Sequence, residues 1–453
     1  MRILYVSQYF PPEMGAPAAR VHGLSKRWVE MGHEVTVLTG FAHHPTGVKA
    51  RRDRWKLTRR EELDGIDVVR AYVYATPNQG TVKRMASYVS FMLSAILVGM
   101  LRVKRPEVVI ATSPQLLCGL AGYLLGKALG APFVFEVRDL WPETMVAVDV
   151  MDSEHLVVRG LRRLSAFLYE RSAHIVTVGE GYAASIRELY GVDQSRMSVV
   201  HNGVDLELFE PAGKHNGVRR QYGWNDRFVL MYVGTHGMCH GLGSVIEVAR
   251  RYRDDARMHF VLVGEGAEKE QLQRTAAEWQ LPNVQFIGGQ PRDRIAQFYA
   301  ACDAGIVCLR KSTRFHEVLP SKIFEYLGME RPIVLGVDGE ARRLVERSGA
   351  GVCVPPEDAE AMAAAVEGLW RRRHTLAQMG RAGRDFVIRH FDRGRLASKY
   401  VNVLEAVLAE YGRTRRQVPR RRSHARCSVA PNGTGHGPLL IKRGTSRKGC
   451  AAE

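Results

Sequence analysis

The chain has 453 residues, of which 45% are hydrophobic and 25% are charged, which is too long for one ordinary domain and suits two. The formal net charge is +18, but residues 412–453 hold eleven Lys and Arg against one acid, so the tail carries +10 and residues 1–411 keep +8. This uneven distribution excludes a uniformly basic fold. It leaves residues 1–411 with a mild excess of positive charge, which suits anionic ligands or an anionic membrane surface.

Strands and helices alternate in the first half of the chain. Residues 2–7 form a short apolar run that predicts a strand, and apolar residues at helical spacing between Val21 and Val29 predict a helix that Gly32 ends. This start is typical of a parallel sheet with crossover helices. Further strands of this half are predicted at 33–39, 67–73, 107–112, 132–137, 174–179 and 197–201.

A turn-rich connector at 202–213 precedes a second alternating series. Its predicted strands are 228–234, 258–264, 284–288, 304–309, 332–336 and 351–354. The predicted fold class is α/β, with two Rossmann-like doubly wound domains facing across a cleft that would hold the ligand, because open α/β sheets bind ligands at the carboxyl ends of their strands. The expected domains are 1–208 on the acceptor side, with a crossover helix at 384–411 returning to it, 209–383 for nucleotide-sugar binding, and a basic disordered tail at 412–453.

An uncharged run of 17 residues, 85–101, lies between Lys83 and Arg84 on one side and Arg102, Lys104 and Arg105 on the other. It could span a membrane, form a buried core helix, or lie in the membrane interface with its basic flanks on phospholipid heads. A spanning helix would divide the sheet, and the basic, apolar stretch 155–173 favours the interface, although that stretch also fits a solvated helix face.

The seven cysteines are scattered without paired spacing, which indicates reduced thiols in the cytosol, and no secretory signal precedes the first strand. No metal site is expected, because His43–His44 and the pair His236 and His240 have no acidic or cysteine partners at ligand spacing. No cofactor is expected either.

The motif FHEVLPSKIFEYLGMERP at 315–332 places Glu317 and Glu325 eight positions apart. Pro320 and Ser321 predict a helix start, with Ser321 as N-cap and Lys322 in the first turn. A hydroxyl, a cation and exposed N–H groups suit a diphosphate, and a carboxylate one turn later could accept hydrogen bonds from ribose hydroxyls. Spacing alone leaves Glu325 equally open to being an acid favoured by the helix dipole.

In order along the chain, HNGVDLELF (201–209), MYVGTHGMCHGL (231–242), FVLVGEGAEKEQL (260–272) and the glutamate motif resemble the retaining glycosyltransferases of family 4, of GT-B architecture. The resemblance covers about residues 1–410. SQYFPPEMGAPAARV (7–21), HHPTG (43–47), EVRDLWPE (136–143) and LPSKIFEY (319–326) are similar to the subgroup of L-fucosamine, colanic-acid and O-antigen sugar transferases.

The resemblance implies a role for each matching residue. Glu325 would bind the ribose, Ser321 and Lys322 the diphosphate, and Glu317 the transferred sugar. Asp139 would be the polar group of the first domain nearest the reacting sugar. Close backbone approach or phosphate contact is implied for Gly15, Gly234, Thr235 and His236.

Two departures from the family pattern concern charge. Arg138 precedes Asp139 where many members have histidine, so Arg138 is a candidate ion-pair partner. The glycine-rich turn offers His236 and His240 instead of Arg and Lys, so Lys322 would carry more of the phosphate charge. His240, Arg310, Lys311 and Arg314 are possible helpers, although 310–314 also fits a solvated loop.

The implied enzyme is a retaining, hexosyltransferase-type glycosyltransferase. It would move a sugar from a nucleotide-diphosphate sugar, with a UDP-linked, N-acetylated amino sugar as a candidate, to a lipid-linked or saccharide acceptor in surface polysaccharide synthesis. It would work in the cytoplasm, peripherally on the inner face of the cell membrane, with no specific nucleic acid. The alternatives are a sugar-nucleotide epimerase on the GT-B scaffold and a non-enzymatic membrane or nucleic-acid binder acting through the tail. A dehydrogenase is disfavoured, because G-x-G-x-x-G does not follow the first strand.

Overall fold

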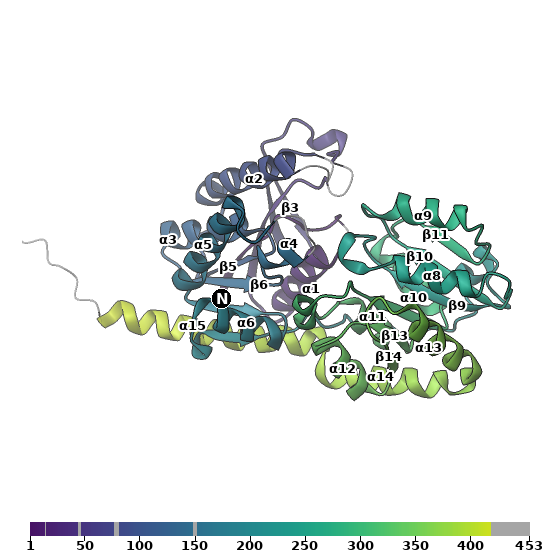
Figure 1. Ribbon diagram of the computed structural model, residues 1–453. Coiled ribbons are helices and arrows are strands. Elements are labelled where there is room, and N and C mark those ends of the chain that lie inside the picture. Colours follow the sequence, from purple (N-terminus) through teal and green to yellow (C-terminus); the bar gives the residue numbers. More distant parts are fainter. Residues whose placement is uncertain (14, 44–46, 77–80, 148–151, 418–453) are drawn as a thin grey trace, which may run out of the picture. The chain divides into compact units, whose positions relative to one another are not determined.

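The computed structural model describes residues 1–13, 15–43, 47–76, 81–147 and 152–417. Within these ranges the chain builds two separate sheets, each with helices between its strands (Figure 1). Both sheets are mostly or entirely parallel, so the predicted pair of Rossmann-like α/β domains is confirmed. Most of the tail that was predicted to be disordered, 418–453, lies outside the described residues.

The first sheet has eight strands in the order β3-β4-β2-β1-β5-β6-β7-β8. Apart from the exposed Arg2, its central strands are buried, which explains why they are continuous apolar runs in the sequence. The strands are β1 (Arg2–Val6), β2 (Glu34–Gly40), β3 (Thr58–Leu63), β4 (Ile66–Ala71), β5 (Val108–Thr112), β6 (Phe133–Val137), β7 (His174–Thr177) and β8 (Met197–Val199).

Strand β3 was not predicted. It pairs antiparallel with β4 through the Asp64–Gly65 turn and lies at the edge of the sheet. Its sequence, TRREEL, is charged, and edge strands tolerate charge because only one side of the backbone is paired. The apolar periodicity that identified the other strands is therefore missing here.

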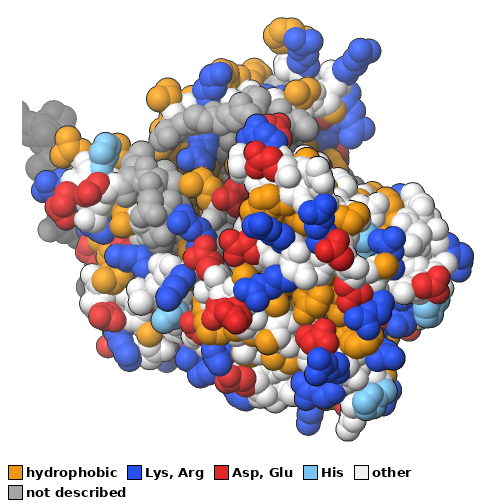
Figure 2. Space-filling model, turned by 45° about the vertical axis from the view of Figure 1, so that its right-hand side comes forward, with side chains coloured by type: hydrophobic (Ala, Val, Ile, Leu, Met, Phe, Trp, Pro, Cys, Tyr) orange, Lys and Arg blue, Asp and Glu red, His pale blue; other side chains and the backbone are white. Residues whose placement is uncertain are grey.

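Helices connect the strands of the first sheet. They are α1 (Ala16–Glu30), α2 (Thr81–Arg102), α3 (Leu116–Leu129), α4 (Glu143–Ala147), α5 (Leu156–Arg171) and α6 (Glu180–Tyr190), with short 3-10 turns η1 (Arg51–Asp53) and η2 (Gln194–Arg196). One side of α2 is buried in the core of this domain, with Phe91 and Ala95 fully shielded, whereas Leu93 and Leu97 point to solvent. On the face of the molecule drawn in Figure 2, Lys and Arg side chains are distributed among exposed hydrophobic ones.

The second sheet is parallel, in the order β11-β10-β9-β12-β13-β14. All six predicted strands are present: β9 (Phe228–Val233), β10 (Met258–Val263), β11 (Val284–Ile287), β12 (Ala304–Cys308), β13 (Ile333–Gly336) and β14 (Gly351–Cys353). The intervening elements are α7 (Gly217–Tyr222), η3 (Met238–His240), α8 (Gly243–Arg251), α9 (Lys269–Glu278), α10 (Arg292–Ala301), η4 (Thr313–Glu317), α11 (Lys322–Gly328), α12 (Glu340–Ser348), α13 (Ala359–Arg371), η5 (Arg373–Thr375) and α14 (Leu376–His390).

The return to the first domain differs in detail from the prediction of one helix over 384–411. Two helices are present instead, α14 and α15 (Arg393–Gln417). Asp392 lies between them and caps α15, because its carboxylate accepts a hydrogen bond from the Arg395 amide at 2.9 Å. Helix α15 packs on the first domain, where Trp28 donates to the Ala397 carbonyl at 3.1 Å. It continues to Gln417, so the first residues of the predicted disordered tail are helical.

Candidate functional site

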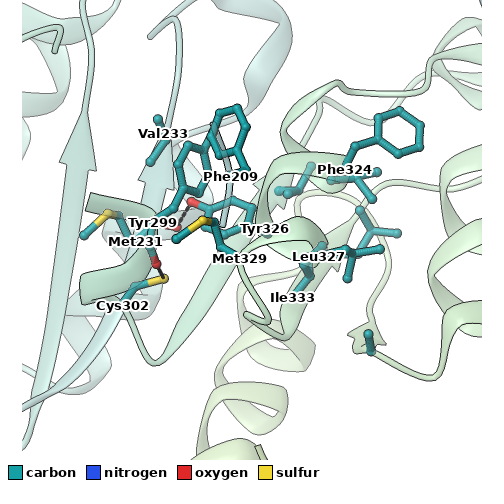
Figure 3. Packing of buried hydrophobic residues seen from close by; sticks show 14 of the residues in the cluster. Phe209, Met231, Val233, Tyr299, Cys302, Phe324, Tyr326, Leu327, Met329 and Ile333 are labelled. Atoms are coloured by element: carbon teal, nitrogen blue, oxygen red, sulfur yellow. Dashed lines mark hydrogen bonds between the residues drawn. The ribbon is translucent and has the colours of Figure 1, made fainter. Parts of the chain in front are cut away.

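Helix α11 is fixed against the second sheet by two tyrosines. Tyr326 donates its hydroxyl hydrogen to the Met231 carbonyl of β9 at 2.6 Å, and its ring meets that of Tyr299 at 4.6 Å between centroids (Figure 3). A Cβ at Gly305 would come within 2.5 Å of the Tyr326 ring, so β12 needs glycine there. The buried side of α11 therefore determines where Lys322 and Glu325 lie.

Lys322 lies over the glycine-rich turn that follows β9. Its Nζ is 3.7 Å from the centroid of the Tyr232 ring and would be 3.0 Å from a Cβ at Gly234. Gly234 has a φ of 137°, which favours glycine. Nζ is buried and has no hydrogen-bond partner among the described residues. The structure thus brings Gly234 and Lys322 together, and the phosphate-binding roles that the resemblance implies for them stay predictions.

Burial makes this turn unusual electrostatically. It lowers the pKa of Lys322 to about 8. Burial, together with Lys269 and Lys322, lowers the pKa of His236 to about 4, and burial with Lys322 lowers that of His240 to about 3. Both histidines are therefore neutral at pH 7, and the ammonium of Lys322 is the positive charge of this turn.

The side chains of the remaining residues of the turn differ in their surroundings. The Thr235 side chain is exposed, and its carbonyl accepts a hydrogen bond from the Tyr232 hydroxyl at 2.7 Å. His236 is fully buried, with neither ring nitrogen bonded to a described residue. His240 Nδ1 lies 3.2 Å from the Gly237 carbonyl.

Glu325 is held in place by Tyr299, whose hydroxyl donates to Glu325 Oε2. Burial raises the pKa of Glu325 above its ordinary value, while the Tyr299 hydrogen bond and the nearby Arg393 act in the opposite direction. Tyr299 was not singled out from the sequence. In the sequence it is an aromatic residue between the predicted strands 284–288 and 304–309, with nothing local that marks it as a partner of Glu325.

Ser321 is the N-cap residue of α11, as predicted, but its side chain does not cap the helix. Its backbone is already helical, with φ −58° and ψ −30°, and its hydroxyl makes no capping hydrogen bond. A capping side chain needs an extended backbone at that position. The hydroxyl instead accepts a hydrogen bond from Asn202 Nδ2 of the connector at 3.4 Å, which leaves its own hydrogen free to donate.

Glu317, at the end of η4, contacts the first domain. Its Oε1 accepts a hydrogen bond from the Ser185 hydroxyl of α6, and a Cβ at Gly181 would come within 2.8 Å of the Glu317 backbone. Burial raises the pKa of Glu317, and the Ser185 hydrogen bond opposes this. Glu340 makes a second contact, accepting the Gly181 amide hydrogen at 3.0 Å at the start of α6. Sequence reasoning missed it, because nothing local marks a carboxylate that caps a distant helix.

Asp139 and Arg138 follow β6 at the carboxyl edge of the first sheet. Asp139 Oδ1 accepts a hydrogen bond from Thr144 at 2.5 Å, and burial raises the pKa of Asp139. Burial, and after it the carboxylate of Asp139, raise the pKa of the Cys239 thiol to about 11. Arg138 forms no ion pair with a described residue, contrary to the expectation, and its Nε and Nη1 are buried without partners.

A buried ion pair that was not predicted joins this edge to the connector. Arg20 of α1 donates to Glu136 of β6 at 2.9 Å, and Tyr5 donates to the same carboxylate at 2.6 Å. Arg20 also donates to the carbonyls of Val200 and His201. The visible signal was a charged residue inside the otherwise apolar strand 133–137.

Gly15, Arg310 and Arg314 are the remaining residues that were predicted for the site. Gly15 has a φ of 128° and precedes α1 without a side-chain cap. Arg310 lies near Glu268 and Arg314 near Glu317, as their effects on the pKa values of those acids show. Neither Arg310 nor Arg314 forms a hydrogen bond with Lys322. Within the described ranges, no three His, Cys, Asp or Glu side chains are grouped so that they could hold a metal ion.

Both halves of the chain match known sequence families. Residues 15–203 match the family described as "Glycosyl transferase 4-like domain", and residues 216–386 match "Glycosyl transferases group 1". The chain is a glycosyltransferase with two domains of the GT-B type. The subgroup and the stereochemical course are not part of these matches.

Two bacterial glycosyltransferases are similar in sequence. "Probable glycosyltransferase WbjE" of Pseudomonas aeruginosa is 26% identical over 269 residues, covering 59% of this chain and 66% of that protein. "Putative colanic acid biosynthesis glycosyl transferase WcaI" of Escherichia coli (strain K12) is 26% identical over 416 residues, covering 89% and 99%. Among solved structures, Anabaena HepE in complex with UDP and glucose has a TM-score of 0.67 at 17% identity, covering 89% of this glycosyltransferase and 99% of HepE.

The pKa of Lys322 gives a testable pH dependence. A group with a pKa of about 8 is protonated at pH 7 and mostly neutral at pH 9. If its charge binds diphosphate, UDP affinity falls about tenfold between pH 7 and pH 9. Isothermal titration of UDP across this range measures the effect. Lys322→Met should bind UDP weakly with a flat profile, and an unchanged slope in that variant would remove Lys322 from the site.

Proposed function

We propose that this glycosyltransferase moves a sugar from a nucleotide-diphosphate sugar to a saccharide or lipid-linked acceptor in surface polysaccharide synthesis. The observation that carries the proposal is the buried ammonium of Lys322 against the Gly234 turn, which has no hydrogen-bond partner among the described residues, with Glu325 on the same helix. A buried cation without a partner is costly unless a ligand supplies the opposite charge. The name of WcaI, which refers to colanic acid biosynthesis, supports the polysaccharide context.

The donor would lie along α11 and the turn after β9. Lys322, the free hydrogen of Ser321 and the backbone at Gly234 and Thr235 would hold the diphosphate, and Glu325 would accept hydrogen bonds from the ribose. Departure of the diphosphate is the difficult step, because negative charge develops on its oxygen. A fixed cation in a water-poor site stabilises that charge in the transition state. UDP is the proposed nucleotide, since HepE was solved with UDP.

The reacting centre would lie toward Asp139, with Glu317 on the transferred sugar and Gly15 allowing close backbone approach. To contact the sugar, Glu317 would exchange its hydrogen bond with Ser185 for one with a sugar hydroxyl. Retention would follow if the departing phosphate takes the acceptor's proton on the same face. His240, Arg310 and Arg314 would act only at the margin of the phosphate, and no metal is required in this scheme.

The acceptor side is proposed to work on the inner face of the cell membrane, through α2. By length and composition alone, Val82–Arg102 could cross a membrane. One side of the helix, however, belongs to the domain core, and Ser94 donates to the Tyr72 carbonyl next to β4. A helix attached in this way can lie on a membrane but cannot leave the sheet to span it.

The outward side of α2 has the character of a membrane contact. Leu93 is 59% exposed and Leu97 56% exposed, and the residues of this apolar stripe are Val82, Ala86, Val89, Leu93, Leu97, Met100 and Leu101. Basic residues flank both ends of the helix. The nearby segment 48–57 adds Trp55, which is 86% exposed. Apolar surface with basic flanks suits an anionic phospholipid layer.

Glu325 can be tested without knowing the sugar. Wild-type protein should bind UDP more tightly than 2′,3′-dideoxy-UDP, because only UDP offers the ribose hydroxyls. Hydrogen bonds to a charged group contribute about 1.5–3 kcal/mol, so the preference should be about tenfold or more. Glu325→Gln should reduce it, with titration calorimetry as the measurement. The exposed Glu278→Gln is the matched control, and a full preference in Glu325→Gln would refute the ribose assignment.

The membrane contact predicts that the protein floats with vesicles containing phosphatidylglycerol and less with phosphatidylcholine alone. Leu93→Glu together with Leu97→Glu should abolish recovery, because the stripe would carry charge into the interface. Leu189→Glu, at an exposed position of α6, is the control and should float normally. Equal flotation of the stripe variant and the wild type would show that α2 is not the contact.

A further inference from the structure

The guanidinium of Arg138 is a second positive centre, separate from Lys322. None of its nitrogens has a hydrogen-bond partner among the described residues, and Nε and Nη1 are shielded from solvent. We propose that Arg138 binds a substrate oxyanion other than the donor diphosphate, namely a carboxylate of an acidic sugar or a phosphate of the acceptor. This proposal rests on the proposed glycosyl transfer and specifies its substrate class.

The carboxylates nearest in sequence to Arg138 already have other donors. Glu136 Oε2 accepts two hydrogen bonds from Arg20, and Glu136 Oε1 accepts one from Tyr5. Asp139 Oδ1 accepts from Thr144. Neither acid lies within ion-pair distance of Arg138. Among the described residues, Arg20 thus has a hydrogen-bonded ion pair, whereas the guanidinium of Arg138 has neither a hydrogen bond nor an ion pair.

The position of Arg138 is firmly determined. Its amide donates to the Ser113 hydroxyl at 2.9 Å, directly after the fully buried strand β6. The carboxyl edge of a parallel sheet is where ligands bind in such folds. Burial raises the pKa of Tyr182 well above its ordinary value. The carboxylates of Asp139, Glu317 and Glu340 raise this pKa further, and Arg138 lowers it, so all four charged groups act on one ring. Arg138 therefore lies among the groups proposed to surround the reacting sugar.

An unpartnered buried cation is destabilising, so the arrangement is reasonable only if a ligand completes it. The planar guanidinium fork matches carboxylate and phosphate groups in a bidentate manner. The donor diphosphate is assigned to Lys322, which lies on α11 of the second domain, whereas Arg138 follows β6 of the first domain. The ligand of Arg138 is then a second anionic group on the donor sugar or on the acceptor.

Two matched probe pairs test this in the full-length protein. UDP-glucuronic acid and UDP-glucose differ by one carboxylate, and geranyl phosphate and geraniol differ by one phosphate. Titration calorimetry should show at least a tenfold preference for the acidic member of one pair in the wild type. A preference in the first pair places the oxyanion on the donor sugar, and a preference in the second places it on the acceptor.

Arg138→Gln should remove that preference and leave the affinity for UDP itself unchanged, whereas Arg138→Lys should keep part of it. The exposed Arg159→Gln is the control and should behave as wild type. No preference in the wild type for either pair, or a preference that persists in Arg138→Gln, would overturn the proposal. If the wild type does not bind UDP at all, that result would instead count against the proposed transfer reaction. Melting curves confirm that each variant is folded, and UDP binding by Arg138→Gln confirms it independently.

Discussion

The ring of Tyr326 packs directly against Gly305, and its hydroxyl donates a hydrogen bond to the Met231 carbonyl. This contact fixes a seven-residue helix at the end of the second sheet. Because Lys322 and Glu325 belong to that helix, their positions follow from it: Lys322 over the Gly234 turn and Glu325 beside Tyr299. The donor site therefore depends on how a tyrosine is buried as much as on the two charged residues that would bind the nucleotide.

Buried charge organises the first domain in the same way. Arg20 and Glu136 satisfy each other and join the sheet to the connector, which explains why two charged residues are tolerated in the core. Arg138 and Lys322 are the contrasting cases, because Lys322 Nζ and the Nε and Nη1 atoms of Arg138 are shielded from solvent and have no hydrogen-bond partner among the described residues. This difference separates the charged groups that hold the protein together from the two that we propose bind substrate.

Local pattern predicted most of the fold, because buried parallel strands are continuous apolar runs that turns and glycines separate. It failed for β3, whose edge position permits a charged sequence. The juxtaposition of Gly234 and Lys322 was predicted through a family resemblance rather than from spacing. The partners of Glu317 and Glu325, namely Ser185 and Tyr299, come from other segments, and no local signal identifies such pairs.

The most direct test of the donor site is a crystal structure of the protein with UDP bound. The account predicts that the diphosphate lies within hydrogen-bond distance, about 3 Å, of Lys322 Nζ. It also predicts that the ribose hydroxyls donate to the Glu325 carboxylate. UDP bound elsewhere, for example in the loop at Gly15 of the first domain with Lys322 still over Tyr232, would contradict it.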